Sequence, residues 1–191
     1  EMRKGAPFRE VAAKFSTAPS APRGGLRGAT TVRGGELRVS GSLAGSLTTV
    51  LSGATLSGNG VVGGLIARSG ATVAPGADGL GVLGVNGAVQ LQSGSTLRLQ
   101  VQALQGADAI VSSGAVQVGG TAAFTNLGGV FAFNSRYVLL QTNGPRTGTF
   151  DAVTGFADFG ILALPFHEDF GGLNGNAVDT MLVMEMLGRG L

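Results

Sequence analysis

Ser52–Leu97 reads SGATLSGNGVVGGLIARSGATVAPGADGLGVLGVNGAVQLQSGSTL, and this stretch decides the expected fold. One short phrase occurs in it three times, as SGATL at Ser52–Leu56, SGATV at Ser69–Val73 and SGSTL at Ser93–Leu97. The three starts are 17 and 24 residues apart. Repeats with a period of about 20–50 residues are typical of solenoids and other stacked arrays. The stretch therefore predicts a repeating, layered structure.

A second phrase, G-x-L-x-V-x-G, occurs at Gly35–Gly41 and again at Gly81–Gly87. Each unit is a few β-branched or leucine residues followed by a glycine-containing turn, a pattern that indicates short strands. Helix is disfavoured because each glycine costs about 1 kcal/mol in a helix interior. A strand-turn unit of about 20 residues buries its apolar side chains only by stacking on a neighbour. The expected fold class is all-β, as a β-solenoid.

The strand centres follow from the β-branched and leucine runs. We expect them near 30–32, 37–39, 47–51, 54–56, 61–66, 72–73, 82–85, 89–91, 96–101, 109–111 and 115–118. Alternation is cleanest in the run Leu97–Val101, which predicts Leu97, Leu99 and Val101 inward with Arg98 and Gln100 outward.

Several segments resemble the passenger domains of bacterial autotransporters. The run GATTVRGGELRVSGSL at Gly28–Leu43 looks like their β-strand repeat. Ser52–Gly76, which ends in Ala-Pro-Gly, is similar to the passenger-associated transport repeat of the same family, and Gly81–Leu97 continues that pattern. DAIVSSGAVQVGGT at Asp108–Thr121 also looks like a passenger segment. The resemblance implies a right-handed parallel β-helix over about residues 28–123.

Residues 124–191 differ in composition, since they contain eight of the ten phenylalanines and the single tyrosine. A solenoid end exposes an apolar cross-section, so terminal units must be atypical caps, and large aromatic side chains supply area there. The run SRYVLLQTNG at Ser135–Gly144, followed by TGTFD at Thr147–Asp151, is similar to the passenger C-terminal region. In that family the region acts as a folding nucleus, called the autochaperone. The resemblance implies folding and capping roles for Tyr137, Leu139, Leu140, Gly148 and Phe150. The Asn143-Gly144 pair is in addition a hairpin-like turn signal.

Composition excludes several classes of protein. Charged residues make up 13% of the chain and mean hydropathy is +0.32, which excludes ordinary charged disorder. No strict G-X-Y period is present, so collagen is excluded. Cysteine is absent, which excludes disulfides, zinc-thiolate sites and thiol catalysis. No apolar run reaches the roughly 18 residues that a membrane helix needs.

Charge is concentrated near the start of the chain. Residues 1–40 hold eight basic and three acidic side chains, whereas residues 41–150 hold four and two. Residues 1–27 carry three prolines and are expected to be a basic linker. A basic arm can contact nucleic acid or an anionic membrane, but eight basic residues over 40, with only Phe8 and Phe15 as aromatic residues among them, are a weak signal, so we expect no nucleic-acid partner. No signal-peptide core follows Glu1, so we expect a longer precursor with its signal upstream.

Candidate chemical sites are sparse. His167 has Glu168 and Asp169 beside it, yet consecutive strand residues point to opposite faces and no second histidine exists, so a surface turn is expected there. A Ser-His-Asp triad assembled in space stays open, although no G-x-S-x-G elbow occurs. Two G-x-G-x-x-G matches, at 58–63 and 79–84, lack a helical continuation. Asp78 and Asp108 are the only acids of residues 41–150, so we expect no catalytic, metal or cofactor site and no small-molecule substrate.

The function implied by the resemblance is structural. We expect a stem, at the bacterial cell surface or released from it, that supports a distal effector, with residues 124–191 nucleating folding during secretion. Its expected partner is the membrane barrel of its own parent chain. Two alternatives remain open: an adhesin module that binds a host protein, and a carrier for an upstream protease or other hydrolase.

Overall fold

The computed structural model describes residues 28–76, 78–129 and 136–155, and within these ranges the chain forms sixteen β-strands and no helix. The strands are β1 (Gly28–Val32), β2 (Gly35–Arg38), β3 (Ser42–Val50), β4 (Ala54–Gly58), β5 (Val61–Ala67), β6 (Thr72–Pro75), β7 (Val82–Val85), β8 (Val89–Leu91), β9 (Thr96–Gln102), β10 (Gly106–Ala107), β11 (Ala109–Ser112), β12 (Val116–Val118), β13 (Thr121–Asn126), β14 (Leu140–Thr142), β15 (Arg146–Gly148) and β16 (Ala152–Thr154). The all-β prediction is confirmed for these residues.

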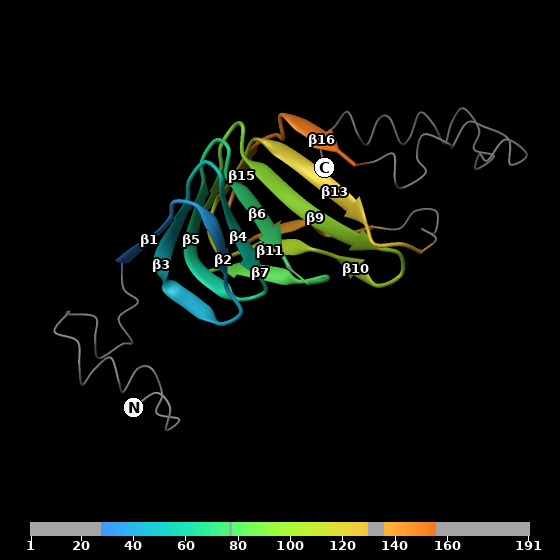
Figure 1. Cartoon of the computed structure of the whole chain (residues 1–191), viewed down its shortest axis with the longest axis horizontal. Helices are drawn as coiled ribbons and strands as arrows, with labels where there is room; N and C mark the ends of the chain where they lie inside the picture. The colour runs from blue at the N-terminus through green and yellow to red at the C-terminus, as the bar shows by residue number, and fades with distance from the viewer. Residues whose placement is uncertain (1–27, 77, 130–135, 156–191) are drawn as a thin grey trace, which may run out of the picture.

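The strands form two sheets that are almost entirely parallel. The nine-stranded sheet has the order β14-β11-β7-β5-β8-β12-β15, with β3 beside β5 and β1 beside β3. The seven-stranded sheet has the order β16-β13-β9-β6-β4-β2, and only β10 pairs antiparallel, with β9. In Figure 1 the colour advances from blue at β1 and β2 to orange at β16 across these sheets.

Apart from β10, each strand pairs with the strand that occupies its place one repeat earlier or later, so the described chain is a series of six layers. The first layer contains β1 and β2, the second β3 and β4, and the third β5 and β6. The fourth contains β7, β8 and β9, the fifth β11, β12 and β13, and the sixth β14, β15 and β16. Stacking of this kind is what a short repeat needs in order to bury its apolar face.

The three copies of the repeated phrase lie on top of one another. Thr55 pairs with Thr72 and Thr72 with Thr96, so the second, third and fourth layers present the same residue at the same place. The next residue in each copy points inward: Leu56, Val73 and Leu97 are each at most 1% exposed. Side chains along parallel strands alternate between the faces. The inward residues of the repeated phrase therefore stack in one column of the core.

The nine-stranded sheet bends where glycines from successive layers stack. A Cβ on Gly87 would lie 2.4 Å from the carbonyl oxygen of Gly63, and one on Gly144 would lie 2.6 Å from the amide nitrogen of Ala115. A Cβ on Gly114 would in turn lie 2.7 Å from the carbonyl carbon of Gly87. Backbone approaches this close exclude any side chain, which explains why the bend recurs at glycine.

The eleven predicted strand centres each fall on an observed strand, and Leu97, Leu99 and Val101 are buried while Arg98 is exposed, as the alternation predicts. Gln100, which was also predicted to point outward, is half-buried. The prediction of a hairpin-like turn at Asn143-Gly144 is wrong. Strands β14 and β15 on either side of it lie at opposite ends of the sheet order and pair with β11 and β12. The backbone bends there because Gly144 stacks on Gly114 and Ala115 of the layer below.

The hairpin that does form was not predicted. It joins β9 to β10 through Ala103, Leu104 and Gln105, with Gln102 opposite Gly106. Its tip contains no glycine, and Leu104 adopts a φ of 62°, a left-handed conformation that leucine rarely takes. The usual glycine or asparagine signal of a tight turn is therefore missing from the sequence.

Candidate folding cap

The sixth layer, residues 136–155, is the last one that the structure describes. Its three strands each pair with one strand of the fifth layer: β14 with β11, β15 with β12 and β16 with β13. In the described part of the chain, the outer edges of these strands carry no further strand. These strands therefore continue both sheets past residue 123 and are their last strands among the residues that the structure describes.

The apolar side chains of this layer turn toward the core. Tyr137, Leu139, Leu140 and Phe150 are half-buried and pack against the buried cluster, together with Val153. They surround a hollow of about 270 Å³ whose floor comes from the preceding layers. Its lining is Leu97, Val118, Ala122, Phe124, Tyr137, Val138, Leu139, Leu140, Arg146, Phe150 and Val153. Four of the five predicted cap residues are thus brought together at the end of the core.

Gly148, the fifth predicted residue, does not line the hollow. It ends β15 with a φ of 76°, and a Cβ at this position would lie 2.2 Å from the carbonyl oxygen of Val118. Only glycine combines this conformation with this close approach. Its role is to let the sixth layer's backbone lie against β12.

Asp151 is a cap residue to which the sequence analysis gave no role of its own. Its carboxylate accepts hydrogen bonds from the Ser93 hydroxyl at 2.8 Å and from the Gly120 amide at 2.9 Å. The Ser93 bond is the main cause that lowers the pKa of Asp151, and the amides of Gly120 and Gly94 add to it against the effect of burial. The sequence does show an acidic residue directly after Phe150. It does not show the hydrogen-bond partners of Asp151, which lie up to 58 residues away.

Asp108 makes a second connection, between the fourth and fifth layers, and unlike the exposed Asp151 it is buried. It is 1% exposed, and its two oxygens accept the amides of Gly81 and Gln100, each at 2.8 Å. Burial raises the pKa of the Asp108 carboxyl, while the two amide bonds oppose that shift. The group is saturated by backbone donors, an arrangement that serves structure rather than acid-base chemistry.

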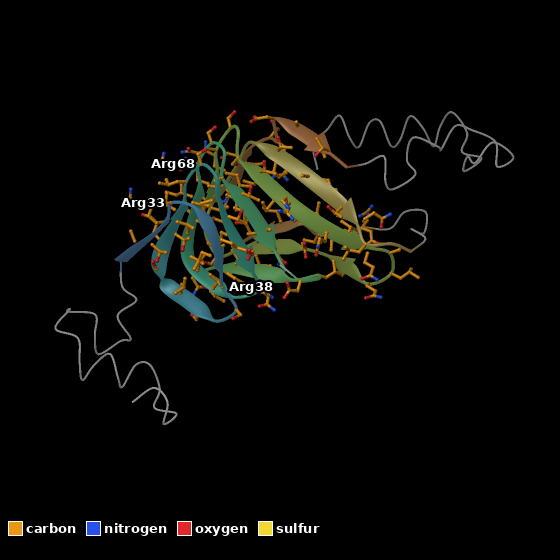
Figure 2. All side chains as sticks on the ribbon, viewed as in Figure 1. Arg33, Arg38 and Arg68 are labelled. Atoms are coloured by element: carbon orange, nitrogen blue, oxygen red, sulfur yellow. The ribbon has the colours of Figure 1, made fainter. Side chains whose placement is uncertain are left out.

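Other charged groups lie on the surface of the sheets. Arg38 forms an ion pair with Asp78 across two layers, which raises the pKa of Arg38 and lowers that of Asp78. Figure 2 shows Arg33 and Arg68 close together on one edge of the molecule and Arg38 on the opposite edge. Exposed pairs of this kind contribute about 0–1 kcal/mol, so the layers depend mainly on packing and backbone hydrogen bonds.

A shallow groove crosses the bend of the nine-stranded sheet. It encloses about 480 Å³ and its lining is uncharged, including Leu47, Ile66, Gln90, Gln117 and Thr147. The Gln90 amide donates to the Gln117 side-chain oxygen at 2.9 Å. The groove therefore presents amide and methyl groups side by side.

Among residues 28–76, 78–129 and 136–155, no group of three or more His, Asp or Glu side chains is placed to hold a metal ion. His167 and its neighbouring acids lie outside these ranges. Both G-x-G-x-x-G matches lead into strands, β5 and β7, and so lack the helix that a dinucleotide-binding turn requires. In the same ranges no helix is long and apolar enough to cross a membrane.

Comparison with known proteins returned no match: no family model, no curated protein and no solved structure resembles the chain significantly.

Proposed function

We propose that this chain is a structural stem of the bacterial autotransporter passenger type, built as a right-handed parallel β-helix, whose sixth layer nucleates folding. The observation that carries the proposal is the closure of the layered core by Tyr137, Leu139, Leu140 and Phe150. The stem supports a distal effector at the cell surface, and its partner is the membrane barrel of the parent chain.

The layered register supports a load-bearing role. Each layer hydrogen-bonds to the next through strands of both sheets, so the layers form one continuous body along the stacking direction. Stability of about 0.05–0.15 kcal/mol per residue gives about 1–3 kcal/mol for a layer of about 20 residues. Layers that fold one after another outside the cell would each favour outward movement of the chain by that amount.

The sixth layer suits nucleation because its apolar residues are local in sequence. Tyr137, Leu139 and Leu140 lie within four residues of one another, and Phe150 follows ten residues after Leu140. Contacts with a short sequence separation cost less loop-closure entropy than contacts between distant layers. Because β14, β15 and β16 pair only with fifth-layer strands, the sixth layer forms together with the fifth, and the two then provide a parallel edge on which the fourth layer can pair.

Surface location is tested on intact cells that express the natural parent chain. Added protease should release a fragment that carries an epitope within residues 41–150, while a cytoplasmic marker protein stays intact. Phe150→Asp should lower the amount of that fragment, and Asn86→Asp, at an exposed turn position, should not. Epitope found only inside the cells would overturn the secretion proposal.

Handedness needs a separate measurement. A crystal structure of the purified chain would show the direction in which the chain passes from layer to layer. A right-handed path from the nine-stranded to the seven-stranded sheet is expected, as in nearly all parallel crossovers. A left-handed path would overturn the β-helix assignment and leave the surface location to be judged by the protease experiment.

A further inference from the structure

A chain of hydrogen bonds runs along one edge of the molecule through the repeated Ser-Gly turns. The Gly53 amide donates to the Gly70 carbonyl at 2.9 Å, and the Gly70 amide donates to the Gly94 carbonyl at 2.8 Å. The three glycines have almost the same φ, 75°, 74° and 77°. The turns are therefore repeats of one conformation, and their amides all point toward the sixth layer.

Aligned amides leave an unpaired donor at the end of the chain of bonds. In a helix, the equivalent donors form the positive end of the dipole and favour a carboxylate. Here the last amide of the series is that of Gly94, which helps to lower the pKa of the Asp151 carboxyl group. The Asp151 side chain reaches this turn through its hydrogen bond from the Ser93 hydroxyl at 2.8 Å.

Asp151 connects three layers at this point. Ser93 and Gly94 belong to the turn before β9, in the fourth layer, and the Ser93 hydroxyl donates to Asp151 at 2.8 Å. Gly120 precedes β13 in the fifth layer, donates its amide to the Asp151 carboxylate at 2.9 Å, and accepts the Asp151 amide at 2.6 Å. Asp151 itself directly precedes β16 in the sixth layer.

We propose that Asp151 is the positioning residue that holds the sixth layer on the turn edge, and that protonation of its carboxyl group releases this layer. The proposal rests on the proposed function of the sixth layer as a folding cap. It adds that low pH controls whether this layer stays bound to the fifth. A carboxylic acid accepts hydrogen bonds more weakly than a carboxylate, so the Ser93 hydroxyl and the Gly120 amide would lose their charged partner together.

The charged groups around Asp151 do not titrate in the same range. The turns packed against it, 92–95 and 119–120, contain no charged residue. On the neighbouring elements the charged residues are Arg68 after β5, Arg98 on β9 and Arg146 on β15, and arginine keeps its charge at every relevant pH. A change in this region on acidification is therefore assigned to the Asp151 carboxyl group.

The direction of the pH effect follows from the hydrogen bonds. The folded protein lowers the pKa of Asp151 below its ordinary value of 3.8, so its contribution is present above that value. It is lost as pH falls through the lower, folded value. Release of the sixth layer is therefore expected below about pH 4.

Hydrogen exchange of the full chain, followed by NMR and corrected for intrinsic rates, tests the proposal. Asp151→Asn should reduce the protection of the Gly94 and Gly120 amides and of β14–β16 at pH 6, because the exposed carboxylate that accepts the Gly120 amide loses its charge. The wild type should show the same loss on acidification, and the variant should show no further loss. Asp78→Asn, at the opposite edge, is the matched control and should leave these amides unchanged.

Unchanged protection in Asp151→Asn, or acid loss that persists in it, would overturn the proposal. Ser93→Ala provides a second measurement, because removal of the hydroxyl donor should move the acid loss to higher pH. An unmoved acid midpoint would count against the assignment. If Asp151 fails these tests while Phe150→Asp still slows folding, the cap function stands without acid control.

Discussion

Asp108 contributes to stability as a buried carboxylate that pairs with backbone amides. Its two carboxylate oxygens satisfy the Gly81 and Gln100 amides inside the protein. The loop before β7 contains Gly76 and Gly79 at positive φ, and a Cβ on Gly76 would lie 2.6 Å from an Asp108 oxygen. The carboxylate therefore fixes a glycine-rich loop that has few apolar contacts of its own.

Asp108→Ala should destabilise the protein by about 2–4 kcal/mol, because each unsatisfied buried amide costs about 1–3 kcal/mol. Urea unfolding followed by circular dichroism measures the change. Asp78→Ala is the matched control, since Asp78 is exposed and its ion pair with Arg38 lies at the surface, where solvent screens it. Equal losses in the two variants would contradict the structural role of Asp108.

The free energy of unfolding should depend on pH partly through the titration of Asp108. Burial raises its folded pKa above the ordinary value of 3.8, so the folded state binds the proton more readily than the unfolded state. That contribution is present below the ordinary value and is lost as pH rises through the raised value. The unfolding free energy of the wild type relative to Asp108→Asn should therefore fall as pH rises above 3.8, in urea titrations at several pH values. A difference that rises with pH would show that the amide hydrogen bonds outweigh burial.

The bend of the nine-stranded sheet forms only where the residues have no side chain, because backbones of successive layers touch there. Gly87→Ala should cost about 1–3 kcal/mol, the usual range for overpacking, because its Cβ would lie 2.4 Å from the Gly63 carbonyl oxygen. Gly34→Ala is the control, with no atom within 4 Å of its Cβ and no positive φ. Thermal or urea unfolding distinguishes them, and a tolerated alanine at 87 would mean that the layers separate easily at the bend.

The sixth layer is the element that the proposed function depends on. Phe150→Asp and Leu139→Asp should each slow refolding several-fold, since a charge placed against Phe124 and Val118 would oppose formation of the layer. Stopped-flow refolding and unfolding rates of the full chain provide the measurement. Asn86→Asp, at an exposed turn, should refold at the wild-type rate. If the substitutions act only on the unfolding rate, the layer forms late and is not a nucleus.

At the scale of the whole molecule, each layer contacts mainly its neighbouring layers. A destabilising substitution should therefore affect mainly the layers next to it. Leu56 is fully buried, between Leu37 and Val73 in the adjacent layers. Leu56→Ala should cost about 2–5 kcal/mol. Hydrogen exchange should increase most in β2, β4 and β6 and least in β13 and β16, as expected for a nearly one-dimensional stack.

Leu104→Ala is the control for that experiment, because Leu104 is 84% exposed at a hairpin tip. Surface substitutions of this kind change stability by about 0.5 kcal/mol or less. Uniform loss of protection across all six layers in Leu56→Ala would indicate that the body unfolds as one cooperative unit rather than layer by layer.

Much of the layered body could be predicted from local sequence. Alternation and glycine-bounded runs placed eleven strands, and the repeated SGATL phrase anticipated the column of Leu56, Val73 and Leu97. The predicted cap residues, apart from Gly148, do gather at the end of the core. These features follow from side-chain period and turn chemistry, which act over a few residues.

The sequence by itself therefore determined where strands occur, which side chains point inward, and that glycine-rich turns separate them. Only the tertiary structure decided that Asn143-Gly144 is a bend, that β9 and β10 form a hairpin, and that Asp108 and Asp151 join separate layers. These features depend on which backbone lies in the next layer. That neighbour is up to 58 residues away across loops of unequal length, so no local pattern specifies it.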